Sequence, residues 1–316
     1  MRAFLLSLLA ERFWLPAYAA LAAAFLVPGD FRWLKPAVPF CLGGILFFAA
    51  LKISFADVRE AALDRRRWRR CFGMAGAKLL LLPAVAWVLV AALAPPWAAG
   101  VTLVMAMPAG LSSVALTDLL GGDRVMALFL IALSSALAPL SVPSAMALVH
   151  PGPAPSPLAF AGQALYILLV LAAPFLGAQA LRALAPRLVA AGMPWWGRLS
   201  IAFLIIMTFV GCAANRHGWE GWQPAALLAP LALVCAAAAL TLGTAWLARR
   251  WLPPGEATAY ACGALYVNNG LSIVYATAFH PGDAYMVLPG VLMQVPMVAT
   301  VVLWGRWQRR LGQIAA

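Results

Sequence analysis

The chain has 316 residues, of which 65% are hydrophobic and 10% charged, with a formal net charge of +12. Soluble domains contain about 45–50% apolar and about 25% charged residues, so this composition excludes a soluble globular protein and indicates a polytopic membrane protein. The apolar runs are continuous rather than alternating, which excludes an outer-membrane barrel.

The apolar residues form ten stretches, each approaching the roughly 20 residues that cross a hydrocarbon core. Because these stretches are rich in alanine and leucine, we expect each to form a membrane-spanning helix. The expected helices cover residues 13–28, 37–53, 71–94, 97–120, 125–148, 158–180, 197–214, 223–247, 256–279 and 284–304. The N-terminal residues before them predict a short interfacial helix, since no small-residue cleavage site follows their short apolar run.

The basic residues lie mainly on one side of the predicted membrane. With a cytoplasmic N-terminus, 18 of the 22 lysines and arginines fall in inner segments and three in outer segments, while Lys78 lies inside the third span. Positively charged loops stay in the cytoplasm, so the asymmetry predicts an inner (plasma) membrane protein with both termini cytoplasmic. Lys78 is expected to snorkel to the cytoplasmic surface; a counter-ion role is the alternative.

A proline-rich run at residues 151–157 divides the chain. This run cannot be a helix interior, and five predicted spans lie on each side of it. An odd number of spans per half inverts the second half relative to the first, as in many secondary transporters. We therefore predict an all-α membrane protein with a first repeat at residues 1–150 and a second repeat at residues 151–316. The fourth and ninth spans are then partners.

The fourth span is interrupted near its middle by the sequence Met-Pro-Ala-Gly-Leu-Ser-Ser-Val, residues 107–114. Pro108 removes a helical hydrogen bond, and Gly110 allows the backbone to bend. The half-helix that restarts there presents free N–H groups and a positive dipole end, which suit an anion. A simple proline kink is the alternative. The hydroxyls at and after the break belong to Ser112, Ser113 and Thr117.

The ninth span is interrupted at the matching point by Val-Asn-Asn-Gly-Leu-Ser-Ile-Val, and Gly270 lies 160 residues after Gly110. The carboxamides of Asn268 and Asn269 are costly in lipid unless they are satisfied or in use. They could ligate a cation through oxygen or bind a carboxylate or sulfonate through nitrogen. Paired breaks in two halves predict the binding site of a secondary transporter, with Ser272 close by. An interhelical clamp is the alternative.

Four further polar residues lie near the predicted breaks. Ser134 and Ser135 in the fifth span are expected to face the break in the fourth, and Gln294 holds the comparable place in the second half. Helix packing is the alternative role for all three. Asp118 is the carboxylate expected within reach of the cavity, where it would carry any proton coupling; a solvated side chain is the alternative.

Sequence signatures of enzymes and metal sites are missing. The chain has no H-E-x-x-H, no G-x-S-x-G, no P-loop and no Cys/His constellation, so we expect neither catalysis nor a resident cofactor. Its five cysteines are scattered and contain no C-x-x-C pair, which predicts apolar packing rather than disulfides. Uphill transport would draw on an ion gradient or a partner; we expect no requirement for an ATP-binding subunit and no nucleic-acid partner.

The chain resembles the bile acid:sodium symporter family over nearly its whole length. Residues 108–123 are similar to the family's Pro-Gly-Gly-x-x-Ser-Asn…Gly-Asn pattern, residues 268–271 to its Asn-Ser-Gly-Leu, and residues 46–57 to its Gly-Leu-x-Leu…Asp-Phe segment. The resemblance implies ten spans with crossing broken helices. It also implies a panel domain from spans 1, 2, 6 and 7 and a core domain from spans 3–5 and 8–10, with substrate in the crevice between them.

The sodium ligands of this family are only partly present. Ser113 and Asn268 match and are the sodium candidates that the resemblance implies. Where the family has other side-chain oxygens, including the glutamate of the ninth span, this chain has Val114, Ala127, Ile131, Gly263 and Val267. Sodium favours anionic oxygen ligands, so we predict transport that depends little on sodium.

The sequence as a whole predicts a secondary transporter of a small amphipathic organic anion in the lipid bilayer. It would work by alternating access between the core and panel domains. A proton-coupled or uncoupled carrier on the same fold, or a membrane receptor that does not transport, are the alternatives.

Overall fold

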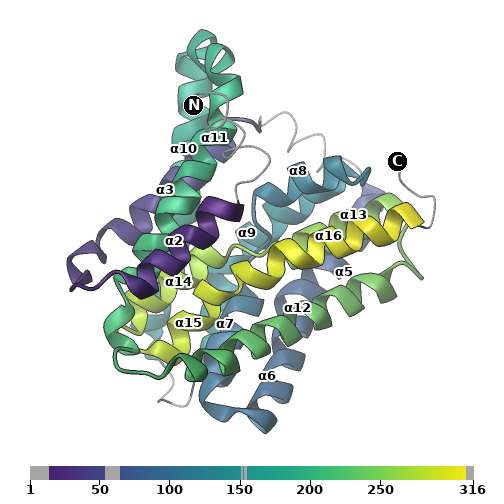
Figure 1. Ribbon diagram of the computed structural model, residues 1–316. Helices are drawn as coiled ribbons and strands as arrows, with labels where there is room; N and C mark the ends of the chain where they lie inside the picture. Colours follow the sequence, from purple (N-terminus) through teal and green to yellow (C-terminus); the bar gives the residue numbers. More distant parts are fainter. Residues whose placement is uncertain (1–13, 54–64, 151, 153–154, 311–316) are drawn as a thin grey trace.

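The computed structural model describes residues 14–53, 65–150, 152 and 155–310 (Figure 1). The expected N-terminal interfacial helix lies outside these residues, as does the end of the segment 46–57. The described residues form helices and contain no strand. The main helices are α2 (Trp14–Leu26), α3 (Ala37–Ala50), α5 (Arg65–Gly76), α6 (Leu82–Leu93), α7 (Ala98–Ala106), α8 (Ser112–Leu119), α9 (Arg124–Val149), α10 (Pro157–Leu184), α11 (Pro186–Ala213), α12 (Leu228–Ala248), α13 (Pro254–Leu265), α14 (Asn269–Phe279), α15 (Ala284–Leu292) and α16 (Gln294–Arg310).

Six helical stretches among the described residues are long and apolar enough to cross a membrane. Two shorter apolar helices cover Leu15–Leu26 and Ala37–Ala50. The predicted fourth and ninth spans are each divided into two short helices, α7 with α8 and α13 with α14. The chain is therefore a multi-pass helical membrane protein, while its division into ten spans and two inverted repeats stays a prediction.

Four helices pack against one another on one side of the molecule. α3 contacts α10 and α11, and α11 also contacts α2; we call α2, α3, α10 and α11 the four-helix unit. Figure 1 shows α10 and α11 running together beyond the other helices. An aromatic cluster holds the unit together, with the Phe48 ring 5.6 Å from that of Phe203 and 5.9 Å from that of Trp196.

The remaining helices surround a buried centre. All nine residues of α7 are buried, and so are the residues of α13 from Glu256 to Leu265 and of α14 from Asn269 to Ala276. In lipid, short helices of this kind persist only where protein encloses them. Helices α7, α13 and α14 therefore lie at the centre of the molecule.

The N-terminus of α9 is fixed by Asp123. Its carboxylate accepts a hydrogen bond from the Met126 amide at 2.9 Å and pairs with the Arg67 guanidinium at 2.8 Å. We expect Asp123→Ala to lower the free energy of unfolding by about 1–2 kcal/mol, mainly through the lost helix cap. Thermal unfolding in detergent measures the change. Asp123→Asn keeps a capping side chain and should cost less; an unchanged melting temperature for the alanine variant would contradict this role.

Candidate functional site

The two breaks lie side by side and are joined through their backbones. The Gly110 amide donates to the Tyr266 carbonyl at 2.8 Å, and the Asn268 amide donates to the Pro108 carbonyl at 2.9 Å. Ala109 and Val267 thus form an antiparallel bridge. Each break leaves backbone groups without helical partners, and buried groups of this kind must be satisfied. We call this meeting of the two chains the crossing.

The residue types at the crossing explain its geometry. Pro108 has no amide hydrogen, and Met107 ends α7 in an extended conformation with ψ at 145°. A Cβ atom on Gly110 would lie only 3.0 Å from the Tyr266 carbonyl oxygen. The close approach of the second chain therefore favours glycine at this position.

The hydroxyls of α8 differ in their surroundings. Ser113 is fully buried, and its hydroxyl has no hydrogen-bond partner within the described part of the chain. Thr117 is also buried and donates to the Ser113 carbonyl at 2.7 Å. Ser112 and Asp118 are exposed. Two of the predicted site residues thus face protein, and two face outward.

The polar residues of the second break also separate into two groups. Asn268 is half-buried, and its side-chain oxygen caps α14 by accepting from the Leu271 amide at 3.2 Å. Its carboxamide nitrogen makes no hydrogen bond among the described residues, so it is available to a ligand. Asn269 is buried, and its nitrogen donates to the Gly290 carbonyl at 3.4 Å. Ser272 donates to the Asn269 carbonyl at 2.7 Å.

Residues beside the crossing contact the four-helix unit. A Cβ atom on Gly270 would lie 3.0 Å from the Leu42 side chain of α3. Gln294, at the start of α16, accepts a hydrogen bond from the Thr208 hydroxyl of α11 at 2.9 Å. Gln294 therefore connects the two parts of the molecule rather than pointing freely into a cavity.

Ser134 supports the first break. Its hydroxyl accepts from the Ala109 amide at 3.2 Å and donates to the Ile131 carbonyl at the same distance, and the residue is fully buried. Ser135 is only half-buried, and its side chain makes no hydrogen bond with the described residues. The structure thus brings Ser134 to the crossing but gives Ser135 no contact there.

We expect Ser134→Ala to lower the free energy of unfolding by about 1–3 kcal/mol, because the buried Ala109 amide loses its acceptor. Ser135→Ala is the matched control and should leave stability nearly unchanged. Thermal unfolding of both variants in detergent makes the comparison. Equal effects of the two substitutions would mean that Ser134 does not stabilise the break.

Lys78 does not snorkel, so that prediction is wrong. The residue is 0% exposed, and its ammonium donates to the Met105 carbonyl at 2.9 Å. It lies in a π-helical turn, Ala77–Leu81, between α5 and α6, which directs the side chain toward α7. The sequence signal was present, a lone lysine inside an apolar span, but its direction could not be read from spacing.

A second set of contacts joins the two parts of the molecule where α9 ends and α10 begins. The Tyr275 hydroxyl of α14 donates to the Gln163 side chain of α10 at 2.8 Å. The rings of Tyr166 and Phe279 meet edge to face, with centroids 5.2 Å apart. These contacts join the four-helix unit to α14 at this end of the molecule. They could not be predicted from the sequence, since none of these residues stands out from its apolar neighbours.

Two histidines lie just beyond this contact. The rings of His150 and His280 have centroids 4.6 Å apart. Burial, together with the charge of His150, lowers the pKa of His280 below its usual value of 6.5. The His280 ring therefore stays largely uncharged at neutral pH.

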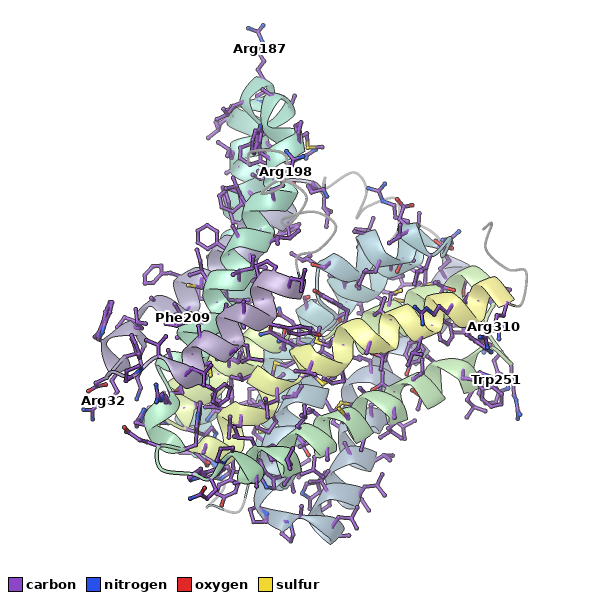
Figure 2. The ribbon with its side chains drawn as sticks, viewed as in Figure 1. Arg32, Arg187, Arg198, Phe209, Trp251 and Arg310 are labelled. Carbon is purple, nitrogen blue, oxygen red and sulfur yellow. The ribbon has the colours of Figure 1, made fainter. Side chains whose placement is uncertain are left out.

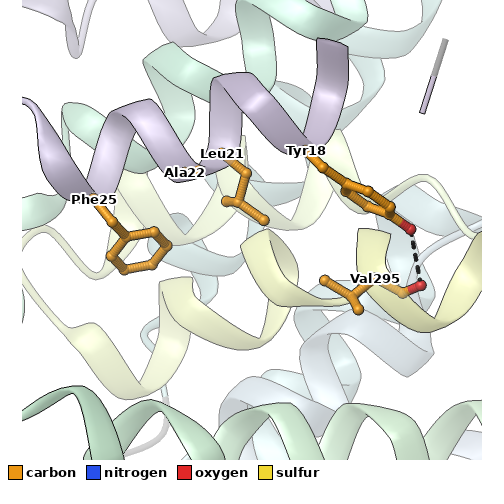
Figure 3. A pocket seen from close by; sticks show the side chains of 5 residues that line it. All are labelled: Tyr18, Leu21, Ala22, Phe25 and Val295. Atoms are coloured by element: carbon orange, nitrogen blue, oxygen red, sulfur yellow. Dashed lines mark hydrogen bonds between the residues drawn. The ribbon is translucent and has the colours of Figure 1, made fainter. Parts of the chain in front are cut away.

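An apolar pocket lies between α2 and α16 (Figure 3). Its volume is about 300 Å³, and its lining comes from Tyr18, Leu21, Ala22, Phe25 and Val295. The Tyr18 hydroxyl crosses its end to donate to the Val295 carbonyl at 3.2 Å. The pocket thus lies where the four-helix unit meets the other helices.

Comparison with known proteins bears out the resemblance seen in the residues. The profile of the Sodium Bile acid symporter family matches residues 39–218, which is more than half of the chain. The chain belongs to this family. Membership places it among transport proteins of the membrane and not among enzymes.

One relative of this symporter-family chain comes from Bacillus subtilis (strain 168). It is described as an uncharacterized sodium-dependent transporter, YocS, and is 31% identical over 132 residues. The match covers 41% of this chain and 40% of that protein. The chain therefore aligns with less than half of the relative's length.

The side chains at this site do not supply the oxygen ligands that the symporter family implies for sodium. A Cβ atom on Gly263 would lie 2.8 Å from the Leu130 side chain, so an apolar group fills the space that a glutamate would need. Val114, Ala127 and Ile131 are also buried among apolar neighbours. The Ser113 hydroxyl remains without a hydrogen-bond partner, and the described residues contain no group of three or more acidic, histidine or cysteine side chains that could hold a metal ion.

Proposed function

We propose that this member of the symporter family is a secondary transporter of a small amphipathic organic anion. The observation that carries the proposal is the crossing, where two interrupted helices meet at the buried centre of the molecule. Such breaks are tolerated at membrane depth where they form a site. The half-helices α8 and α14 begin there, and their positive N-terminal ends favour an anionic group.

The apolar part of the substrate would contact the pocket between α2 and α16. That pocket is lined by aliphatic and aromatic side chains, and the half-buried Asn268 provides a free carboxamide nitrogen at the crossing. A molecule with a charged head and an apolar body satisfies both surroundings. This combination is the reason for proposing an amphipathic substrate.

Transport would proceed by movement of the four-helix unit, as the panel, against the other helices, as the core. The contacts of Tyr275 with Gln163 and of Tyr166 with Phe279 join these parts at one end of the molecule. We infer that this end faces outward and that the described conformation is closed there. Breaking these contacts would open the site to the outside.

The basic residues support a cytoplasmic location for both termini in an inner (plasma) membrane. In Figure 2, Arg32 lies at the lower left, whereas Arg187, Arg198 and Arg310 lie along the upper and right-hand edges. Positively charged segments remain in the cytoplasm, so we assign the arginine-rich side to the inside. Labelling of cysteines placed in the linker at residues 151–157 of intact cells would test this assignment; labelling from inside alone would overturn it.

A screen of organic anions by thermal shift, with and without sodium, would identify a substrate class. The anion that gives the largest shift then serves as the probe for uptake into proteoliposomes. Time-dependent uptake that saturates supports a transporter. Binding without flux would favour the alternative, a membrane receptor.

Uptake of that anion is expected to depend little on sodium, because the site lacks a carboxylate to compensate the ion. Asp118, exposed on α8, is the residue that we propose for any proton coupling. Uptake is measured in sodium and in choline buffer over a pH series, with Asp118→Asn alongside. We expect equal rates in both buffers and a flattened pH profile in the variant. A steep sodium dependence that survives Asp118→Asn would refute both expectations.

A further inference from the structure

Lys78 is a charged group enclosed at the centre of a membrane protein. It is 0% exposed, and among the described residues it has no carboxylate within salt-bridge distance. Its one hydrogen-bond acceptor is the Met105 carbonyl at 2.9 Å. A charge in this position is costly unless it performs a task. The transport scheme proposed above gives it none.

The partner of Lys78 is a carbonyl that the first break leaves without its helical donor. In an unbroken helix the Met105 oxygen would accept from the Ala109 amide, four residues later. That amide instead donates to the Ser134 hydroxyl at 3.2 Å. The Lys78 ammonium therefore replaces a backbone donor that the interruption removed.

The end of α7 is also electrostatically suited to a cation. Its last carbonyls point toward the crossing and carry the partial negative charge of a helix C-terminus. Met105 lies in the last turn of this helix, which ends at Ala106. A cation is stabilised here even without a carboxylate, and the Lys78 ammonium supplies one from within the chain.

The backbone around Lys78 directs its side chain toward the end of α7. The π-helical turn Ala77–Leu81 inserts an extra residue between α5 and α6, and π turns are frequent at functional sites. Pro83, the second residue of α6, provides no amide for the Leu79 carbonyl, which favours the wider turn. An uninterrupted α-helix would direct residue 78 differently.

We propose that Lys78 is the resident cation of the crossing, which stabilises the end of α7 in place of a bound sodium ion. The proposal rests on the transport function proposed above and deepens it, since it explains how this site dispenses with sodium. The apolar packing of Gly263 against Leu130 agrees, because it leaves no room for a carboxylate that would compensate a second cation beside Lys78.

The test uses sodium alone as the probe and requires no substrate. Thermal unfolding is compared in sodium chloride and in choline chloride at equal ionic strength, for wild type, Lys78→Gln and Lys78→Met. Wild type should melt at the same temperature in both salts. Lys78→Gln removes the charge and places a neutral oxygen near the Met105 carbonyl, so its melting temperature should rise with sodium and saturate. Lys78→Met has a similar length but no oxygen and should show no sodium effect.

Sodium-dependent stabilisation of the wild type would overturn the proposal. A Lys78→Gln variant whose melting temperature does not change with sodium would overturn it as well. If Lys78→Gln fails to fold, binding of radioactive sodium to the wild-type protein is measured instead. The absence of bound sodium would support the proposal, and stoichiometric binding would overturn it. Failure of organic-anion uptake would leave this result intact, so the two proposals are tested separately.

Discussion

Replacing Asn268 by alanine is expected to reduce uptake of the organic anion by at least tenfold while the protein remains folded. The carboxamide nitrogen is free at the crossing, and a hydrogen bond to a charged group contributes about 1.5–3 kcal/mol. A loss of 1.4 kcal/mol already corresponds to about a tenfold change in affinity. Initial uptake rates into proteoliposomes, normalised to protein content, measure the effect.

A control is needed because Asn268 also caps α14 through its side-chain oxygen. Asn268→Ser keeps a capping oxygen, whereas the alanine variant loses it at about 1 kcal/mol. We therefore expect the serine variant to melt close to wild type and yet to transport as poorly as the alanine variant. Transport at the wild-type rate by Asn268→Ser would show that the carboxamide does not bind the transported anion.

Linking α10 to α14 at their contact is expected to stop transport almost completely. In the variant Gln163→Cys/Tyr275→Cys, the two thiols would replace side chains that meet at 2.8 Å. Such long side chains leave the backbones too far apart for a direct disulfide, so a bifunctional methanethiosulfonate reagent is used. Because the link holds the four-helix unit against the core, uptake should fall by at least tenfold and return after reduction.

The cross-linking experiment is carried out in a Cys235→Ser background, because Cys235 could also react with the reagent. Cys235 is exposed, whereas Cys41, Cys71, Cys212 and Cys262 are buried. The single variants Gln163→Cys and Tyr275→Cys, treated in the same way, should keep most of their uptake. Full transport by the linked protein would show that this end does not open during the cycle.

The interrupted helices could be predicted from sequence because proline, glycine and adjacent polar residues have strong local effects. Pro108 and Gly110 in one span and Asn268 to Gly270 in its partner mark the breaks, and the structure joins them by backbone hydrogen bonds. The helical segments likewise follow from long apolar stretches. These signals need only a few neighbouring residues to be read.

The roles of single polar side chains could not be predicted in the same way, because they depend on which helices pack together. Ser134 and Ser135 are neighbours in sequence, yet only Ser134 reaches the Ala109 amide. Lys78 was expected at the membrane surface, but a π-helical turn directs it inward to Met105. Local spacing does not contain this information.

The most direct test of the account is anion uptake by purified protein in proteoliposomes, measured in sodium chloride and in choline chloride. We expect saturable uptake of the screened anion at nearly the same rate in both salts, and loss of this uptake in Asn268→Ala. Anion binding without any uptake in either salt would contradict transport at the crossing.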